Sequence, residues 1–424
     1  MAIMDPMKNI SAAALTIAVG CTLLAVDEPD GLRLPSGFHA TVVAEGLGPI
    51  RHLAVRDDGA LYVSTPRDQK GTGKGGGIIA LRLDASHKAV DVQRFGSIDG
   101  GTGIRFHNGA LYATSPSGIY RFTFAGNALV PTKDPDTIVD GMPTTFPGFN
   151  RANRPLAFDA GGHVFVSVEA SGNFCAEPET KPNTPPVGLK PCPDLGARAG
   201  IWRFNAEKTG QKFPADGERW ATGIRDLSAL AWSPADESLY AIMHGRDSLN
   251  RNWPNLVSAE DDDHIADEMH RVIKGTDFGW PYTYYDGVRR MRLVSPEYGG
   301  DGRTAARGAY STPVLTFQSR RAAPVDLLFY NGTSFPVTYK DGAFIVLHGT
   351  ANRTGYDVVF VPFGKTGKAG EPVVFADGFA AFDPSSTTPR AKYRPIGAAV
   401  GPDGSIYVAD SQVGRIWRIA HGGN

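Results

Sequence analysis

The chain repeats one pattern of polar and apolar positions six times. Each copy has a tight turn, a small residue and then an apolar run, and the copies are residues 58–64, 108–114, 161–167, 236–242, 341–346 and 403–409. Asp-Gly or Asn-Gly at most of these turns supplies the positive φ of a two-residue hairpin. The apolar runs suit strands that are buried on both faces. The repeat therefore predicts a series of β-hairpins.

Further apolar segments extend each hairpin to a four-stranded unit. One strand precedes each turn, as in 53–55, and others follow it, as in 78–83 and 373–375. Units of this kind at intervals of about 50 residues or more are typical of a β-propeller. We therefore predict an all-β fold, a six-bladed β-propeller over residues 34–421. A β-sandwich or two separate β domains is the alternative.

The last unit lacks one strand, because the chain ends soon after Ile419. The alternating segment 38–43 near the N-terminus fits this vacancy. We predict that the N-terminal strand closes the ring, which removes the open sheet edge.

The N-terminal residues 1–26 are interpreted as a leader followed by a signal peptide, since Lys8 precedes an apolar stretch over 10–26. The stretch is too short for a membrane span, so we expect a periplasmic or secreted protein with no stable membrane insertion after cleavage. Lipidation at Cys21 is an alternative. The net charge of −1 argues against a nucleic-acid partner.

Two other cysteines, Cys175 and Cys192, flank a Pro-rich insertion over 176–191. In an export compartment this arrangement favours a disulfide. Two free buried thiols are the alternative.

The long connections are predicted to lie on one face of the propeller, where binding residues tend to gather. Arginines precede the inner strands of five of the six blades: Arg51, Arg151 with Arg154, Arg225, Arg321 and Arg394. Such a ring at the channel mouth indicates an anionic ligand with several carboxylates or phosphates. Alternatively, each arginine pairs with a local acid such as Asp226 or Glu169.

His244 and His348 begin loops on this face and are acid/base candidates. The acidic segment that contains Gly245, Arg246, Asp247, Asp267 and Glu268 could hold Ca²⁺, which prefers carboxylate and carbonyl oxygens. A solvated acidic loop is the alternative.

The chain resembles the glucose/sorbosone dehydrogenase family, soluble sugar dehydrogenases that depend on pyrroloquinoline quinone (PQQ). The phrases that carry the resemblance are 221–226, 245–247, 267–268, 278–282, 323–324, 347–353 and 394–397 with 402–404. The resemblance runs from about residue 34 to residue 420.

The resemblance implies PQQ and Ca²⁺ as cofactors, a sugar or alcohol as substrate and an external electron acceptor. It places Arg51, Arg225, Asp226, Arg353 and Arg394 at the quinone. The segments with Gly245, Arg246, Asp247, Asp267 and Glu268 would then hold the ion, a Lewis acid at the quinone carbonyl.

One departure from the family affects the catalytic centre. Arg151 stands where the family carries its base, a histidine, and arginine is not a base at ordinary pH. His348, His244 or Glu169 could have taken this role. The leading function is thus a quinoprotein oxidoreductase acting on a sugar, a sugar aldehyde or another secondary alcohol. A cofactor-independent hydrolase or lyase for an anionic substrate, and a non-catalytic ligand-binding propeller, are the alternatives.

Overall fold

The structure is a computed structural model of the 424-residue chain. It describes residues 25–27, 31–66, 76–98, 100–144, 153–177, 185–318, 322–350, 354–364, 366–382 and 390–422. The predicted signal peptide and Cys21 lie almost wholly outside these residues. Within them, no helix is long and apolar enough to cross a membrane.

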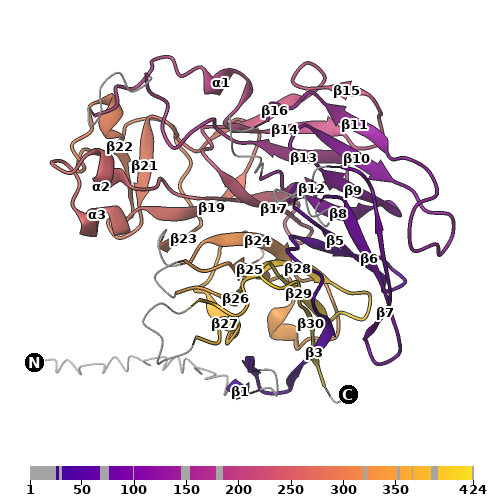
Figure 1. Cartoon of the computed structure of the whole chain (residues 1–424). Helices are drawn as coiled ribbons and strands as arrows, with labels where there is room; N and C mark the ends of the chain where they lie inside the picture. Colours follow the sequence, from indigo (N-terminus) through magenta and orange to yellow (C-terminus); the bar gives the residue numbers. More distant parts are fainter. Residues whose placement is uncertain are drawn as a thin grey trace, which may run out of the picture.

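Six antiparallel blades follow one another around a central axis, as predicted (Figure 1). The first three are β4 (Leu53–Val55), β5 (Leu61–Ser64), β6 (Ile78–Leu83) and β7 (Ala89–Phe95); β8 (Ile104–His107), β9 (Ala110–Thr114), β10 (Gly118–Phe122) and β11 (Asp136–Asp140); and β12 (Leu156–Phe158), β13 (His163–Val168), β14 (Gly200–Asn205) and β16 (Glu218–Thr222). The last three are β17 (Leu227–Ser233), β18 (Ser238–Met243), β19 (Ala266–Val272) and β23 (Leu315–Gln318); β24 (Pro324–Phe329), β25 (Ala343–Leu347), β26 (Asp357–Val361) and β27 (Val373–Ala376); and β28 (Pro395–Val400), β29 (Ile406–Asp410), β30 (Ile416–His421) and β3 (Phe38–Ala44).

The closure of the ring by the N-terminal strand is confirmed. β3 pairs antiparallel with β30, with Phe38 opposite His421 and Val42 opposite Trp417. Each inner strand contacts the inner strand of the next blade, and β28 contacts β4. The sheet edge that a missing strand would leave is therefore covered by the other end of the chain.

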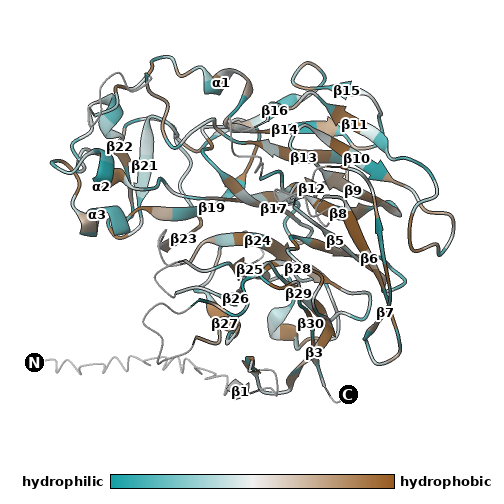
Figure 2. Cartoon of the chain, viewed as in Figure 1, coloured by the Kyte–Doolittle hydropathy of each residue, from teal (hydrophilic) through white to brown (hydrophobic). Residues whose placement is uncertain are grey.

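The hairpin turns and the buried runs explain why the repeated pattern folds in this way. Gly59 and Gly404 have φ values of 84° and 77°, and Glu237, which stands where other copies have glycine, also has a positive φ of 47°. The strand that follows each turn is almost wholly buried, and the clusters of buried side chains lie between neighbouring blades. Figure 2 shows the hydrophobic residues concentrated on the strands and hydrophilic residues on α2 (Leu249–Asn252).

Some elements lie outside the six repeated blades. The hairpin of β21 (Thr283–Asp286) and β22 (Met291–Val294) lies beside α2 and α3 (Ala259–Asp263) at one side of the ring (Figure 1). The short strands β15 (Gln211–Lys212) and β20 (Thr276–Asp277) add parallel to β11 and β16, and β1 (Ala25–Asp27) pairs with β2 (Arg33–Pro35). Three further short elements are α1 (Asp194–Ala197), η1 (Pro296–Tyr298) and η2 (Val337–Tyr339).

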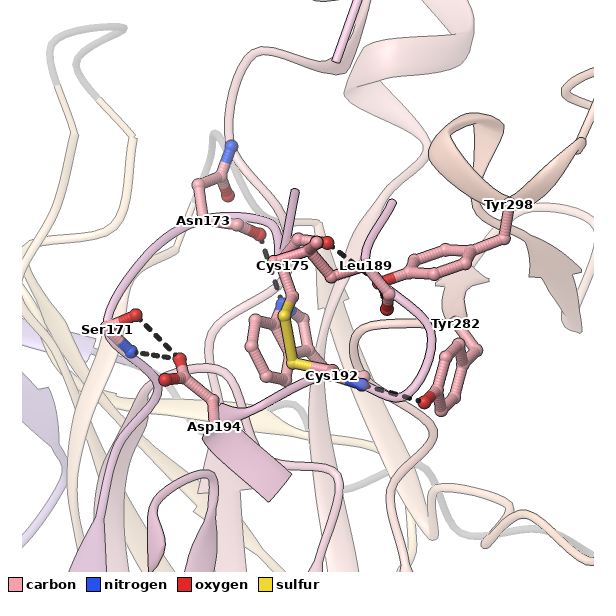
Figure 3. The surroundings of a disulfide bond; sticks show 9 residues. Ser171, Asn173, Cys175, Leu189, Cys192, Asp194, Tyr282 and Tyr298 are labelled. Atoms are coloured by element: carbon pink, nitrogen blue, oxygen red, sulfur yellow. Dashed lines mark hydrogen bonds between the residues drawn. A yellow bond between two sulfur atoms is a disulfide. The ribbon is translucent and has the colours of Figure 1, made fainter. Parts of the chain in front are cut away.

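The predicted disulfide joins Cys175 to Cys192 (Figure 3). Tyr298 donates hydrogen bonds from its hydroxyl to the carbonyls of Cys175 and Leu189 at 2.8 and 3.1 Å. Trp280 donates from its ring to the carbonyl of Asn173 at 3.1 Å. The stapled loop is thus held against the segment that contains the Gly-Trp-Pro phrase.

Candidate functional site

The central channel contains a matched cluster of charges that the sequence analysis missed. Asp326 in β24 is 2% exposed and accepts a hydrogen bond from Arg105 in β8 at 2.8 Å and from the backbone N–H of Ala398 in β28 at 2.9 Å. His52, just before β4, lies 3.9 Å from the same carboxylate and donates to the carbonyl of Val325 at 2.9 Å. This cluster ties together the inner strands of four blades.

A second group of basic side chains lies at the channel mouth around His348. His348 follows β25, Arg394 precedes β28 and Arg51 precedes β4. Burial lowers the pKa of His348 well below its ordinary value, and the nearby basic groups of Arg394, Arg51, His244 and His52 lower it further. The four side chains that act on it most are all basic. His348 is therefore neutral at neutral pH.

Hydrogen bonds orient both His348 and Arg394. The Nε2 atom of His348 lies 2.9 Å from the Oγ atom of Ser411, which in turn lies 3.3 Å from the carbonyl of Arg394. Arg394 donates from its guanidinium to the carbonyls of His348 and Gly349 at 3.3 and 2.8 Å. A chain from Nε2–H through the Ser411 hydroxyl to this carbonyl leaves Nδ1 of His348 as the proton-accepting nitrogen.

His244 has the opposite protonation state from His348. Although burial disfavours its charge, hydrogen bonding and charge from Asp226, with charge from Asp267, raise the pKa of His244 to about 9. Its Nδ1 atom lies 3.6 Å from Asp226 and its Nε2 atom donates to the carbonyl of Pro324 at 2.8 Å. His244 is thus a cation at neutral pH and a poor proton acceptor.

Asp226 links His244 to Glu169. Asp226 accepts a hydrogen bond from Asn153 at 2.8 Å, and its contacts with His244 hold its pKa below the ordinary value against the effect of burial. Burial and the neighbouring Asp226 raise the pKa of Glu169 well above its ordinary value. Glu169, which is 6% exposed, is therefore a neutral acid and not a base in this state.

Arg225 is held by acceptors on the fourth blade. Its guanidinium contacts the carbonyls of His244 and Gly245 and forms an ion pair with the exposed carboxylate of Asp247. Asn173 fixes Asp247 by accepting from its N–H at 3.0 Å and donating to its carbonyl at 2.7 Å. The disulfide loop thereby reaches the site through Asn173.

The residues proposed for Ca²⁺ are only partly brought together. Asp267 is 1% exposed, accepts from the N–H of Gly245 at 2.9 Å and has a buried Oδ2 atom with no hydrogen-bond partner. Burial raises the pKa of Asp267 to about 6. Glu268, its neighbour on β19, pairs instead with Arg292 and lies 3.1 Å from His270.

Arg246 also turns away from the mouth, because its guanidinium forms a buried ion pair with Glu297 at 2.5 Å. No group of three His, Cys, Asp or Glu suited to a metal ion occurs in the part of the chain that the structure describes. The donor set therefore fits a cation at one carboxylate oxygen of Asp267, while the oxygens of Gly245 and Asp247 are engaged by Arg225. The metal assignments stay predictions.

Arg151, Arg321 and Arg353 lie outside the described residues, so their predicted roles stay predictions as well. Arg154 is fully buried, and its guanidinium donates to the carbonyls of Pro116, Pro143 and Ser167. Arg154 thus supports the third blade and does not line the mouth.

Fold and geometry define a six-bladed β-propeller whose long-loop face carries a buried cluster of titratable groups. A sequence model of the family described as TrAA12-like matches residues 32–286 and 292–422. The chain belongs to this family, and the predicted kinship with the soluble PQQ-dependent sugar dehydrogenases is confirmed.

Solved structures share the fold at low sequence identity. The holo form of the pyranose dehydrogenase PQQ domain from Coprinopsis cinerea superposes with a TM-score of 0.68 at 17% identity, covering 93% of this chain and 98% of that one. A calcium structure of the Trichoderma reesei carbohydrate-active enzyme of family AA12 gives 0.68 and 17%, covering 95% and 100%. The PQQ-bound aldose sugar dehydrogenase from Streptomyces coelicolor gives 0.55 and 19%, covering 91% and 99%.

Among curated sequences, an uncharacterized protein of Borreliella burgdorferi is 26% identical over 205 residues. The match covers 47% of this chain and 48% of that protein, about half the length of each.

Proposed function

We propose that this chain is a PQQ-dependent oxidoreductase that oxidises a sugar, a sugar aldehyde or another secondary alcohol and passes the electrons to an external acceptor. The observation that carries the proposal is the convergence of Arg394, Arg51 and the charged His244 on the neutral His348, since a quinone with three carboxylates is a ligand that such cations can bind. Family membership and the PQQ-containing structures of the same fold support it.

Arg394 and Arg51 are the residues that we expect to hold cofactor carboxylates. Both approach His348 from neighbouring blades, and the carbonyls of His348 and Gly349 already orient the Arg394 guanidinium. His244, charged through its contact with Asp226, adds a third positive group. When bound, PQQ supplies the carbonyl group that accepts a hydride from the substrate.

His348 is the residue that we expect to take the hydroxyl proton of the substrate. It is neutral and one ring nitrogen is available, whereas His244 is charged and Glu169 is protonated. Its depressed pKa makes it a weak base but keeps it unprotonated over a wide pH range. Ser411 fixes the ring so that Nδ1 is the accepting atom.

Ca²⁺ would be held by Asp267 together with oxygens that Arg225 now contacts. We infer that Arg225 must turn from Gly245 and Asp247 toward an anionic group before these oxygens can bind a cation. The same movement would bring its guanidinium to the cofactor, the role that the family resemblance implies.

A periplasmic or secreted location is part of the proposal. The Cys175–Cys192 disulfide supports it, because such bonds persist in oxidising compartments.

The test is to treat the purified protein with a chelator, add PQQ and Ca²⁺ together or singly, and follow dye reduction with a panel of aldoses and secondary alcohols. We expect turnover only when both are present. Absence of turnover together with absence of PQQ binding would refute the proposal. Turnover of an anionic substrate by the chelator-treated protein without PQQ would favour a hydrolase or lyase.

A further inference from the structure

A second pocket lies on the long-loop face, between the N-terminal strand β2 and the fifth blade. Its volume is about 400 Å³, and it is lined in part by Arg33, Tyr356, Asp357 and Phe382. Small-molecule sites usually measure about 300–1,000 Å³. Asp357 is the first residue of β26, and Phe382 lies six residues beyond the end of β27, so the pocket opens where the connections of the fifth blade lie.

The carboxyl group of Asp357 lines the pocket, and that of Asp377 lies next to the lining residue Gly378. Burial, followed by the charge of Asp377, raises the pKa of Asp357 to about 7. Asp377 receives an ion pair from Arg33 at 2.8 Å, while its Oδ1 atom is buried and has no hydrogen-bond partner. Asp377 lies behind the lining, so the pocket offers the carboxyl oxygens of Asp357 to a ligand as hydrogen-bond acceptors.

Aromatic rings form another part of the lining. The rings of Tyr356 and Phe382 meet edge to face, with their centroids 5.3 Å apart. Tyr356 is held in a left-handed backbone conformation, with φ at 68°, and its hydroxyl donates to the carbonyl of Thr350 at 2.7 Å. Strained positions of this kind tend to occur at functional sites.

Tyr356 also connects the pocket with the channel mouth. The guanidinium of Arg394 lies over its ring, 5.8 Å from the ring centroid. One residue thus lines the pocket and contacts a group that we assign to the cofactor. A ligand in the pocket could therefore extend toward the reacting centre.

The chemistry of the lining selects among ligands. Among the described lining residues Arg33 is the only cation, and it is already paired with Asp377, so the pocket lacks the several cations that a quinone with three carboxylates needs. A metal ion is disfavoured because the described residues place no third acidic, histidine or cysteine ligand there and because Arg33 already neutralises Asp377. Uncharged sugars fit, since their hydroxyls donate to carboxyl oxygens and their C–H faces pack on aromatic rings.

We propose that the pocket around Asp357, Tyr356 and Phe382 binds an uncharged sugar unit of a saccharide whose other end reaches the channel mouth at Arg394. Binding of the sugar unit is independent of the proposed oxidoreductase function. The statement that the other end is oxidised rests on that function.

The experiment compares the full-length wild-type protein with Asp357→Asn, which keeps the shape of the side chain and removes its charge. Asp57→Asn, at an exposed position in the turn between β4 and β5, is the matched control. Binding is measured without cofactor by calorimetry and saturation-transfer NMR, with uncharged mono-, di- and trisaccharides of gluco, galacto, manno, fuco and xylo configuration. Turnover is measured separately with PQQ and Ca²⁺.

We expect at least one di- or trisaccharide to bind more tightly than its monosaccharide. Asp357→Asn should weaken that binding about tenfold, the usual loss for a hydrogen bond to a charged group, and Asp57→Asn should not change it. In turnover, Asp357→Asn should raise KM for the longer sugar by the same factor and leave kcat unchanged.

Three outcomes overturn the subsite: no saccharide of the panel binds, binding is equal in Asp357→Asn and wild type, or Ca²⁺ binds there in place of a sugar. Sugar binding that depends on Asp357, without any turnover, would retain the subsite and count against the oxidoreductase function. The two proposals can therefore fail separately.

Discussion

Two groups of titratable residues occupy the centre of the propeller, and they differ in the groups that surround the central side chain. In the channel, the Asp326 carboxylate is matched by Arg105, by a backbone N–H and by nearby His52. At the mouth, the side chains that act most strongly on His348 are all basic. A buried carboxylate held by partners on several blades serves structure, whereas basic groups that converge on one neutral histidine are suited to a ligand of opposite charge.

A large effect on stability should follow from breaking the matched cluster. Asp326→Asn leaves the Arg105 guanidinium without its carboxylate and should lower the free energy of unfolding by about 3 kcal/mol. His348→Gln, at the channel mouth, should change it by less than about 1 kcal/mol. Urea unfolding of both variants checks the comparison, and equal losses would show that the two clusters do not differ in role.

The largest effect on activity should follow from replacing His348 at the channel mouth. His348→Gln removes the proposed proton acceptor and should lower kcat by about 10²–10⁴-fold, the usual contribution of general base catalysis. Retained PQQ affinity would show that the site is otherwise intact. Dye reduction with wild-type kcat in this variant would exclude His348 as the base.

The disulfide should affect both stability and the fourth-blade part of the site. Cys175→Ser with Cys192→Ser should lower the free energy of unfolding by about 3 kcal/mol. It should also weaken PQQ binding, since the stapled loop fixes Asp247 through Asn173 and Asp247 holds Arg225. Calorimetric titration of the double variant with PQQ tests this. An unchanged affinity would show that the stapled loop does not contribute to cofactor binding.

The smallest effect concerns pH, and here His244 and His348 should act with opposite signs. The folded-state pKa of His244 is raised to about 9, so its contribution to stability is complete below about pH 6.5 and is lost as the pH rises through 9. The folded-state pKa of His348 is lowered, so its contribution is present above about pH 6.5 and is lost on acidification.

Unfolding free energies of His244→Gln and His348→Gln, measured from pH 5 to about pH 10, check these signs against the wild type. In the His244 variant, the free energy of unfolding should no longer decrease at alkaline pH. In the His348 variant, it should decrease less at acid pH than in the wild type. If the free energy of unfolding depended on pH in the same way in both variants, the assigned charge states would be contradicted.

The architecture was predictable because it rests on local signals. Turn residues, alternating strands and the vacancy filled by β3 all follow from short segments, and the disulfide follows from two cysteines around one insertion. The hairpin β21–β22 was missed because it lies outside the repeat. A lone acid in an apolar strand, Asp326, was a signal that the pattern analysis did not use.

The site was predictable only in part, because its chemistry depends on contacts between distant segments. His244 and His348 look alike in sequence, but one lies beside Asp226 and the other among arginines. Arg246 and Glu268 stand in the expected acidic segment, yet Glu297 and Arg292 engage them. Side-chain direction decides these roles, and residue order along the chain does not reveal it.

The central claim is that the basic groups around His348 at the channel mouth bind an anionic cofactor. The most direct test is the pKa of His348, followed by NMR in histidine-labelled protein with and without saturating PQQ. The account predicts a pKa well below about 6.5 in the free protein and a clear rise when PQQ is bound. An ordinary pKa in the free protein, or no change on adding PQQ, would contradict it.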